Sequence, residues 1–75
     1  MTDHVRGKLD GIVRLLNDGR MDDAESTCRG YLIGDPDEIN LLGILGAMLI
    51  RKGDLDEAEQ HLRRAIGIEP GFAKP

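Results

Sequence analysis

Aromatic and sulfur-containing anchors are scarce in this chain of 75 residues. It has no tryptophan, one tyrosine, one phenylalanine and a single cysteine, Cys28. The core must therefore be aliphatic, which excludes a sandwich or barrel built around large rings. A lone thiol can form neither an internal disulfide nor a cysteine-based zinc site. A chain of this length supports one small domain.

Long hydrophobic runs and an excess of positive charge are missing as well. The most apolar stretch, residues 39–50, is interrupted by Asn40 and is shorter than the roughly 20 residues that a membrane span needs. A net charge of −4 argues against nucleic acid or an anionic membrane as the main partner. The N-terminal residues lack the apolar core of a secretory signal, so we expect a cytoplasmic protein.

An internal repeat organises the sequence. Gly19, Ala24 and Pro36 recur as Gly53, Ala58 and Pro70, always 34 residues later, with acidic residues between them in both copies. A fixed period of this length is typical of stacked supersecondary units.

Each copy of the repeat predicts two helices. Leu42, Leu45 and Leu49 recur at spacings of three and four, as on one helix face, and the glycines suit left-handed helix ends. Acidic pairs follow the glycines where a helix start favours negative charge, and each proline ends the second helix. The pattern predicts four helices near residues 3–17, 22–33, 37–51 and 55–67, and no strand.

The second copy resembles a tetratricopeptide repeat. The resemblance rests on Leu45-Gly46, Leu49, Gly53-Asp54, Ala58, Leu62, Ala65 and Pro70. It implies an all-α fold of two stacked antiparallel helix hairpins in a right-handed superhelix (an α-solenoid). Residues 1–75 would form one domain, with repeat 1 at about 5–38, repeat 2 at about 39–72, and 73–75 as a tail or the start of a further helix. The first copy departs from the family pattern at Lys8, Gly11-Ile12 and Tyr31, as an atypical terminal repeat would.

The resemblance also implies a partner-binding groove along the first helix of each hairpin. Such grooves hold an extended peptide or a helix. The residues that would face it are Arg6, Leu9, Asp10, Val13, Leu16, Asn17, Asn40, Gly43, Ile44, Ala47, Ile50 and Arg51, and about half of them would be packing residues instead.

Chemistry-bearing residues are few. Cys28 falls where the repeat needs a medium-sized apolar side chain, at the position of Leu62 in the second copy. His4 begins the first helix, and His61 lies four residues after Glu57, where a surface contact is expected. These positions predict no metal, no cofactor and no catalytic residue, so we expect that the chain is not an enzyme.

The last predicted helix carries Leu55, Leu62 and Ile66 on a side without a following repeat in this sequence. Burial of these side chains against a second copy would remove them from water. They are therefore predicted self-association residues of a possible homodimer.

Three functions are compatible with these features. The first is an adaptor that binds an unidentified protein or peptide. The second is a leading repeat segment of a longer bacterial enzyme, because residues 16–29 resemble repeats that precede sulfotransferase-like or hydroxylase-like domains, where the repeats position or dimerise the catalytic part. The third is a purely structural self-association module.

The repeat pattern yields a direct spectroscopic prediction. Circular dichroism at neutral pH should show more than about half of the residues in helix, above the usual third of globular proteins. A spectrum dominated by strand or coil would contradict the repeat assignment.

Overall fold

The computed structural model describes residues 3–71, and the side chains of residues 7–71. It contains four α-helices: α1 (Asp3–Asn17), α2 (Met21–Gly34), α3 (Ile39–Lys52) and α4 (Leu55–Ile68). Within the described range there is no strand, so the all-helical prediction is confirmed, and every helix end lies within two residues of its predicted place. The largest difference is the start of α3, where Glu38 caps the helix by accepting a hydrogen bond from the Asn40 amide at 2.9 Å.

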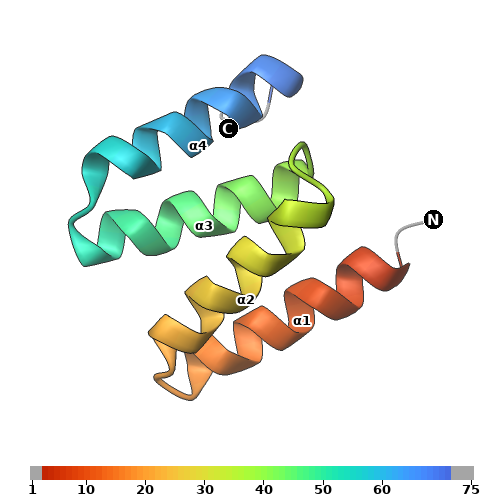
Figure 1. Cartoon of the computed structure of the whole chain (residues 1–75), viewed down its shortest axis with the longest axis vertical. Coiled ribbons are helices and arrows are strands. Elements are labelled where there is room, and N and C mark those ends of the chain that lie inside the picture. Colours follow the sequence, from red (N-terminus) through yellow and green to blue (C-terminus); the bar gives the residue numbers. More distant parts are fainter. Residues whose placement is uncertain (1–2, 72–75) are drawn as a thin grey trace.

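The helices pack in chain order. α1 contacts α2, α2 contacts α3, and α3 contacts α4. Figure 1 shows α1 and α2 as one hairpin and α3 and α4 as a second, with α2 and α3 joining them. No helix between residues 3 and 71 is both long and apolar enough to cross a membrane.

The loop that joins the two helices has the same backbone conformation in both hairpins. Gly19 and Gly53 adopt φ angles of 77° and 87°, a left-handed conformation that favours glycine. The Gly19 amide donates to the Leu16 carbonyl and the Arg20 amide to the Leu15 carbonyl; in the second hairpin Gly53 and Asp54 donate to Ile50 and Leu49. These bonds occupy carbonyls that a helix end leaves unpaired. The predicted left-handed caps are confirmed in both copies.

The core is centred on α3, which buries Leu41, Leu42, Leu45, Gly46, Met48 and Leu49. Small side chains from the neighbouring helices meet it, because Ala24 and Cys28 of α2 and Ala58 of α4 are buried in the same cluster. Ala24 and Ala58, which recur 34 residues apart in the sequence, are therefore both buried. The core is aliphatic, as the composition requires.

The two hairpins differ in which helix supplies the larger side chain at the contact between their two helices. A Cβ placed on Gly46 of α3 would lie 2.8 Å from Cγ of Leu62, so the absence of a side chain lets α4 bring its leucine against α3. The corresponding positions in the first hairpin are Ile12 and Cys28, both fully buried in the core. The larger side chain comes from the first helix in one hairpin and from the second helix in the other. This exchange explains why the two copies of the repeat differ at Ile12 and Gly46.

Tyr31 of α2, one of the two aromatic residues of the chain, contacts a basic side chain of α1. The ammonium group of Lys8 lies 5.0 Å from the centre of the Tyr31 ring, a cation–π contact between α1 and α2. The ring is half-buried and packs against the core cluster. The two residues therefore act as a pair across the first hairpin.

The Gly46–Leu62 contact predicts the sign of two glycine substitutions. Gly46→Ala should lower the free energy of unfolding by about 1–2 kcal/mol, because overpacking outweighs the gain in helix propensity. The matched Gly30→Ala, in open space on α2, should raise it by about 0.5–1 kcal/mol. Urea unfolding measures both values. In a Leu62→Ala background the cost of Gly46→Ala should vanish; equal stabilisation by both alanines in the wild type would contradict this packing.

Candidate interaction surfaces

The residues predicted to line a groove divide into two groups. Leu9, Leu16 and Ile44 are half-buried and pack against the core. Gly43 is half-buried, and the side chain of Arg6 lies outside the described residues. The remaining residues are exposed on α1 and α3, with Val13 44% and Ile50 49% accessible: Asp10, Val13, Asn17, Asn40, Ala47, Ile50 and Arg51. Val13 and Ala47 occupy equivalent repeat positions, as do Asn17 and Arg51.

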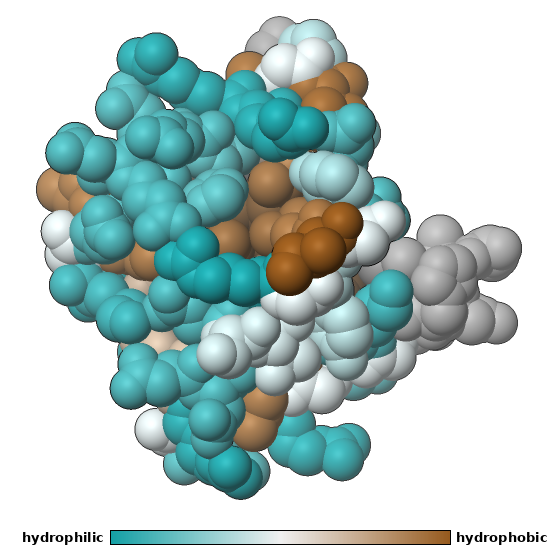
Figure 2. Space-filling view, in the orientation of Figure 1, coloured by the Kyte–Doolittle hydropathy of each residue, from teal (hydrophilic) through white to brown (hydrophobic). Residues whose placement is uncertain are grey.

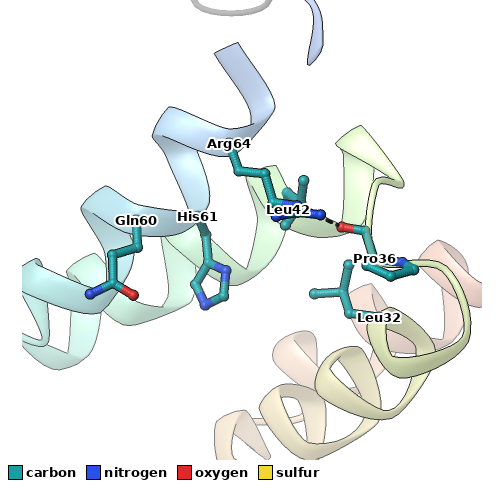
Figure 3. Close-up of a pocket in the computed structure, with 6 residues that line it drawn as sticks. All are labelled: Leu32, Pro36, Leu42, Gln60, His61 and Arg64. Carbon is teal, nitrogen blue, oxygen red and sulfur yellow. Dashed lines mark hydrogen bonds between the residues drawn. The ribbon is translucent and has the colours of Figure 1, made fainter. Parts of the chain in front are cut away.

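A hollow between α2 and α4 was not predicted. It has a volume of about 370 Å³ and is lined by Leu32, Pro36, Leu42, Gln60, His61 and Arg64. Figure 3 shows Leu42 of α3 and Leu32 of α2 beside the polar side chains of α4. The guanidinium of Arg64 closes one end by donating to the Pro36 carbonyl at 3.2 Å and to the Asp37 carboxylate at 2.6 Å. The spacing of His61 and Arg64 in the sequence places them on one face of α4. The sequence did not indicate that this face lies opposite α2.

A second depression, of about 280 Å³, shares Leu32 and His61 with this hollow and adds Arg29, Ile33 and Leu45. The Ile33 side chain is 84% exposed, the highest value among the large hydrophobic residues of the described chain. Figure 2 shows hydrophobic surface set among polar side chains on one face of the molecule. The cations near these depressions already have acidic partners, so the depressions present mainly apolar contacts.

Charged side chains form a network across three helices. Arg29 of α2 donates to Glu57 of α4 through Nη1 (2.5 Å) and Nη2 (3.0 Å), and to Glu25 one turn back on α2. Lys52 of α3 binds Glu25 at 2.7 Å, and His61 contacts Glu57 at 3.0 Å. The expected His61–Glu57 contact is confirmed. The sequence did not predict that the pair belongs to a network that joins α2, α3 and α4.

This network shifts the pKa of its members in the directions that opposite charges require. Hydrogen bonds from Arg29 and His61 lower the pKa of Glu57 to about 2. Lys52 and Arg29 lower the pKa of Glu25, and Glu57 and Glu25 raise that of Arg29. These carboxylates are ionised partners of cations, so they serve to hold the helices together.

The predicted self-association residues lie on the outer side of α4. Leu55 is 61% and Ile66 40% exposed, whereas Leu62 is half-buried against Gly46. With Ile50 of α3 they line a depression of about 330 Å³, which we call the end face: Ile50, Leu55, Ala58, Glu59, Leu62, Arg63 and Ile66. Dimerisation through these residues remains a prediction.

Cys28 is fully buried, and its Sγ lies 3.4 Å from the Leu41 carbonyl as a hydrogen-bond donor. Burial raises the pKa of this thiol to about 11. The predicted packing role of Cys28 is therefore confirmed. Among the residues that the structure describes, no three histidine, cysteine or acidic side chains are grouped as metal ligands would be. His4 lies in α1 with its side chain outside the described range.

Comparison with known proteins gives one informative similarity. No family model matches the chain, and no solved structure matches it. The chain is 37% identical over 62 residues to the probable biofilm formation methyltransferase WspC of Pseudomonas putida. The match covers 83% of this chain but only 15% of that protein.

The match corrects one expectation from the sequence. We expected that the chain is not an enzyme, on the grounds that no catalytic motif or pocket was visible. Most of its length is similar to a segment of a protein described as a methyltransferase, so an enzymatic relationship is indicated. Motif searching could not show this, because the similarity lies in a helical segment without catalytic signatures.

The charge network predicts a specific loss of stability in acid. Because the pKa of Glu57 is lowered on folding, its contribution is present above about pH 4–5 and is lost as the pH falls toward 2. Glu57→Gln should lower the free energy of unfolding at pH 7 by about 0.5–1 kcal/mol and flatten its decline between pH 5 and 2.

Glu59→Gln is the matched control, since it removes only an exposed ion pair with Arg63 on the same helix. Its effect in denaturant unfolding at pH 7 should be smaller than that of Glu57→Gln. Equal effects of the two variants would contradict a cross-helix role for Glu57.

Proposed function

We propose that this chain is a protein-interaction module of the tetratricopeptide type, which binds a peptide or helix of a partner along the exposed residues of α1 and α3. The observation that carries the proposal is the recurrence of one structural unit after 34 residues. The left-handed glycine caps and the buried alanines occupy equivalent positions in both hairpins. A recurring unit of this kind presents equivalent residues of its first helices in series.

The exposed residues of α1 and α3 suit a protein ligand. Val13 and Ala47 offer small apolar contacts at equivalent repeat positions, and Ile50 adds a larger one. Asp10, Asn17 and Arg51 place hydrogen-bonding groups beside them. An amphipathic segment, with one apolar side and polar edges, is complementary to such a surface.

Similarity to a methyltransferase favours a second, compatible function. We propose that in a protein of that kind the segment positions the enzyme on a protein partner. The observation in favour is that 83% of this chain matches a small part of a much longer methyltransferase. This proposal replaces the sulfotransferase and hydroxylase contexts suggested by the sequence. A reading frame that joins this sequence to a methyltransferase domain supports it, and one without such a domain contradicts it.

Site-specific photo-crosslinking tests the proposed binding surface. A photoreactive amino acid at Val13 or at Ala47, in the natural full-length protein expressed in its own cells, should yield the same discrete protein adduct. The same group at Ser26, exposed on α2, serves as the control and should not yield it. Adducts at Ser26 alone, or none at Val13 and Ala47, would contradict binding along α1 and α3.

A further inference from the structure

One aliphatic side chain of α2 projects into solvent beside the hollow between α2 and α4. Ile33 is 84% exposed, and the equivalent residue of repeat 2, 34 positions later, is Gly67. The exposed isoleucine is therefore a feature of repeat 1 alone. At this exposure it contributes little to the packing of one hairpin on the other.

The helix surface around Ile33 carries no side chain. Gly30 lies three residues before it and Gly34 one residue after it, so the three residues share one face of α2. A Cβ built at either glycine would meet nothing within 4 Å. Glycine is less favourable than alanine in a helix, and no contact among the described residues requires it at these two positions. The two glycines leave Ile33 open to close approach by another molecule.

Ile33 also borders open apolar space. With Leu45 it lines the depression of about 280 Å³. That depression shares Leu32 and His61 with the larger hollow of about 370 Å³, and Figure 3 shows the space between these two side chains. An apolar cavity of about 150 Å³ is large enough to hold benzene, so either volume has room for an isoleucine side chain.

The charged groups around this space are already paired within the chain. Arg64 donates to the Asp37 carboxylate at 2.6 Å. Arg29 donates to Glu25 at 2.8 Å and to Glu57 at 3.0 Å. A charged occupant would have to break one of these pairs or leave its own charge without a partner. The occupant that fits is an uncharged aliphatic side chain on a surface that lets it approach closely.

This chain presents such a side chain on the same face. We propose that two copies associate through it, with Ile33 of each copy seated in the hollow between Leu32 and His61 of the other. Because Ile33 and the hollow adjoin, one two-fold rotation forms both contacts and closes the assembly at a dimer. The contact is small, so the dimer belongs to the weak, transient class. It uses neither the α1 and α3 surface proposed above nor the end face.

Sedimentation of the 75-residue chain between about 10 μM and about 1 mM tests the association. The mass should rise from 8.2 kDa toward twice that value. Ile33→Lys should raise the dissociation constant at least about tenfold, because its ammonium group would lose water in an apolar hollow. Ile68→Lys is the matched control, at an exposed isoleucine that lines neither depression, and should leave the dissociation constant unchanged.

A pair of complementary variants shows whether Ile33 enters the hollow of the other copy. Gln60 is exposed at this hollow, so Gln60→Glu adds a carboxylate there. A mixture of the Ile33→Lys and Gln60→Glu chains should associate at least about threefold more tightly than a mixture of Ile33→Lys with the wild type. Equal association of the two mixtures would overturn the seating of Ile33 in this hollow.

The remaining outcomes are equally decisive. A mass that stays at 8.2 kDa at every concentration would overturn the proposal. So would equal weakening by Ile33→Lys and Ile68→Lys. A dimer that dissociates in the Leu55→Lys variant and persists in Ile33→Lys would assign the association to the end face, and the proposal would be wrong.

Discussion

The burial of α3 on two sides is the constraint on which the rest of the structure depends. A helix can lie between two others only if they approach closely, and small side chains make that approach possible: Ala24 and Cys28 on the α2 side, and Gly46 of α3 itself on the α4 side. With this spacing, aliphatic side chains alone fill the interior. A chain with so few aromatic residues can therefore form a continuous core, whose energy comes from many modest contacts around one helix.

Much of the fold follows from local sequence signals that occur in both copies of the repeat. The left-handed glycines, the acidic first turns and the two prolines each act within a few residues, so their positions determine where the helices begin and end. The fixed offset of 34 then identifies equivalent positions, such as Ala24 and Ala58, and their common burial could be predicted. The start of α3 differed because Glu38 caps the helix through its side chain, a choice that the three acidic residues before Ile39 leave open.

The site was less predictable because it depends on how helices rotate against each other. Leu9 and Ile44 were assigned to a groove, but the rotation of α1 and α3 turns them toward the core. The hollow at Leu32, His61 and Arg64 joins α2 to α4 across about 30 residues of sequence, and no local pattern specifies such a pairing. The ion pair between Arg29 and Glu57 is of the same kind. Ile12 and Gly46 occupy equivalent repeat positions but differ greatly in side-chain volume. Equivalent positions therefore need not carry side chains of similar size.

The reactivity of the Cys28 thiol depends on internal motion of the protein. The thiol is the single one in the chain, and it lies between α2 and α3 with its proton directed at the Leu41 carbonyl. A thiolate reacts with alkylating reagents and oxidants, and burial disfavours that form. Reaction therefore requires that the helices packed around Cys28 move apart, while each helix can stay formed. The rate of thiol modification reports how often this packing opens, an event that helical content alone does not register.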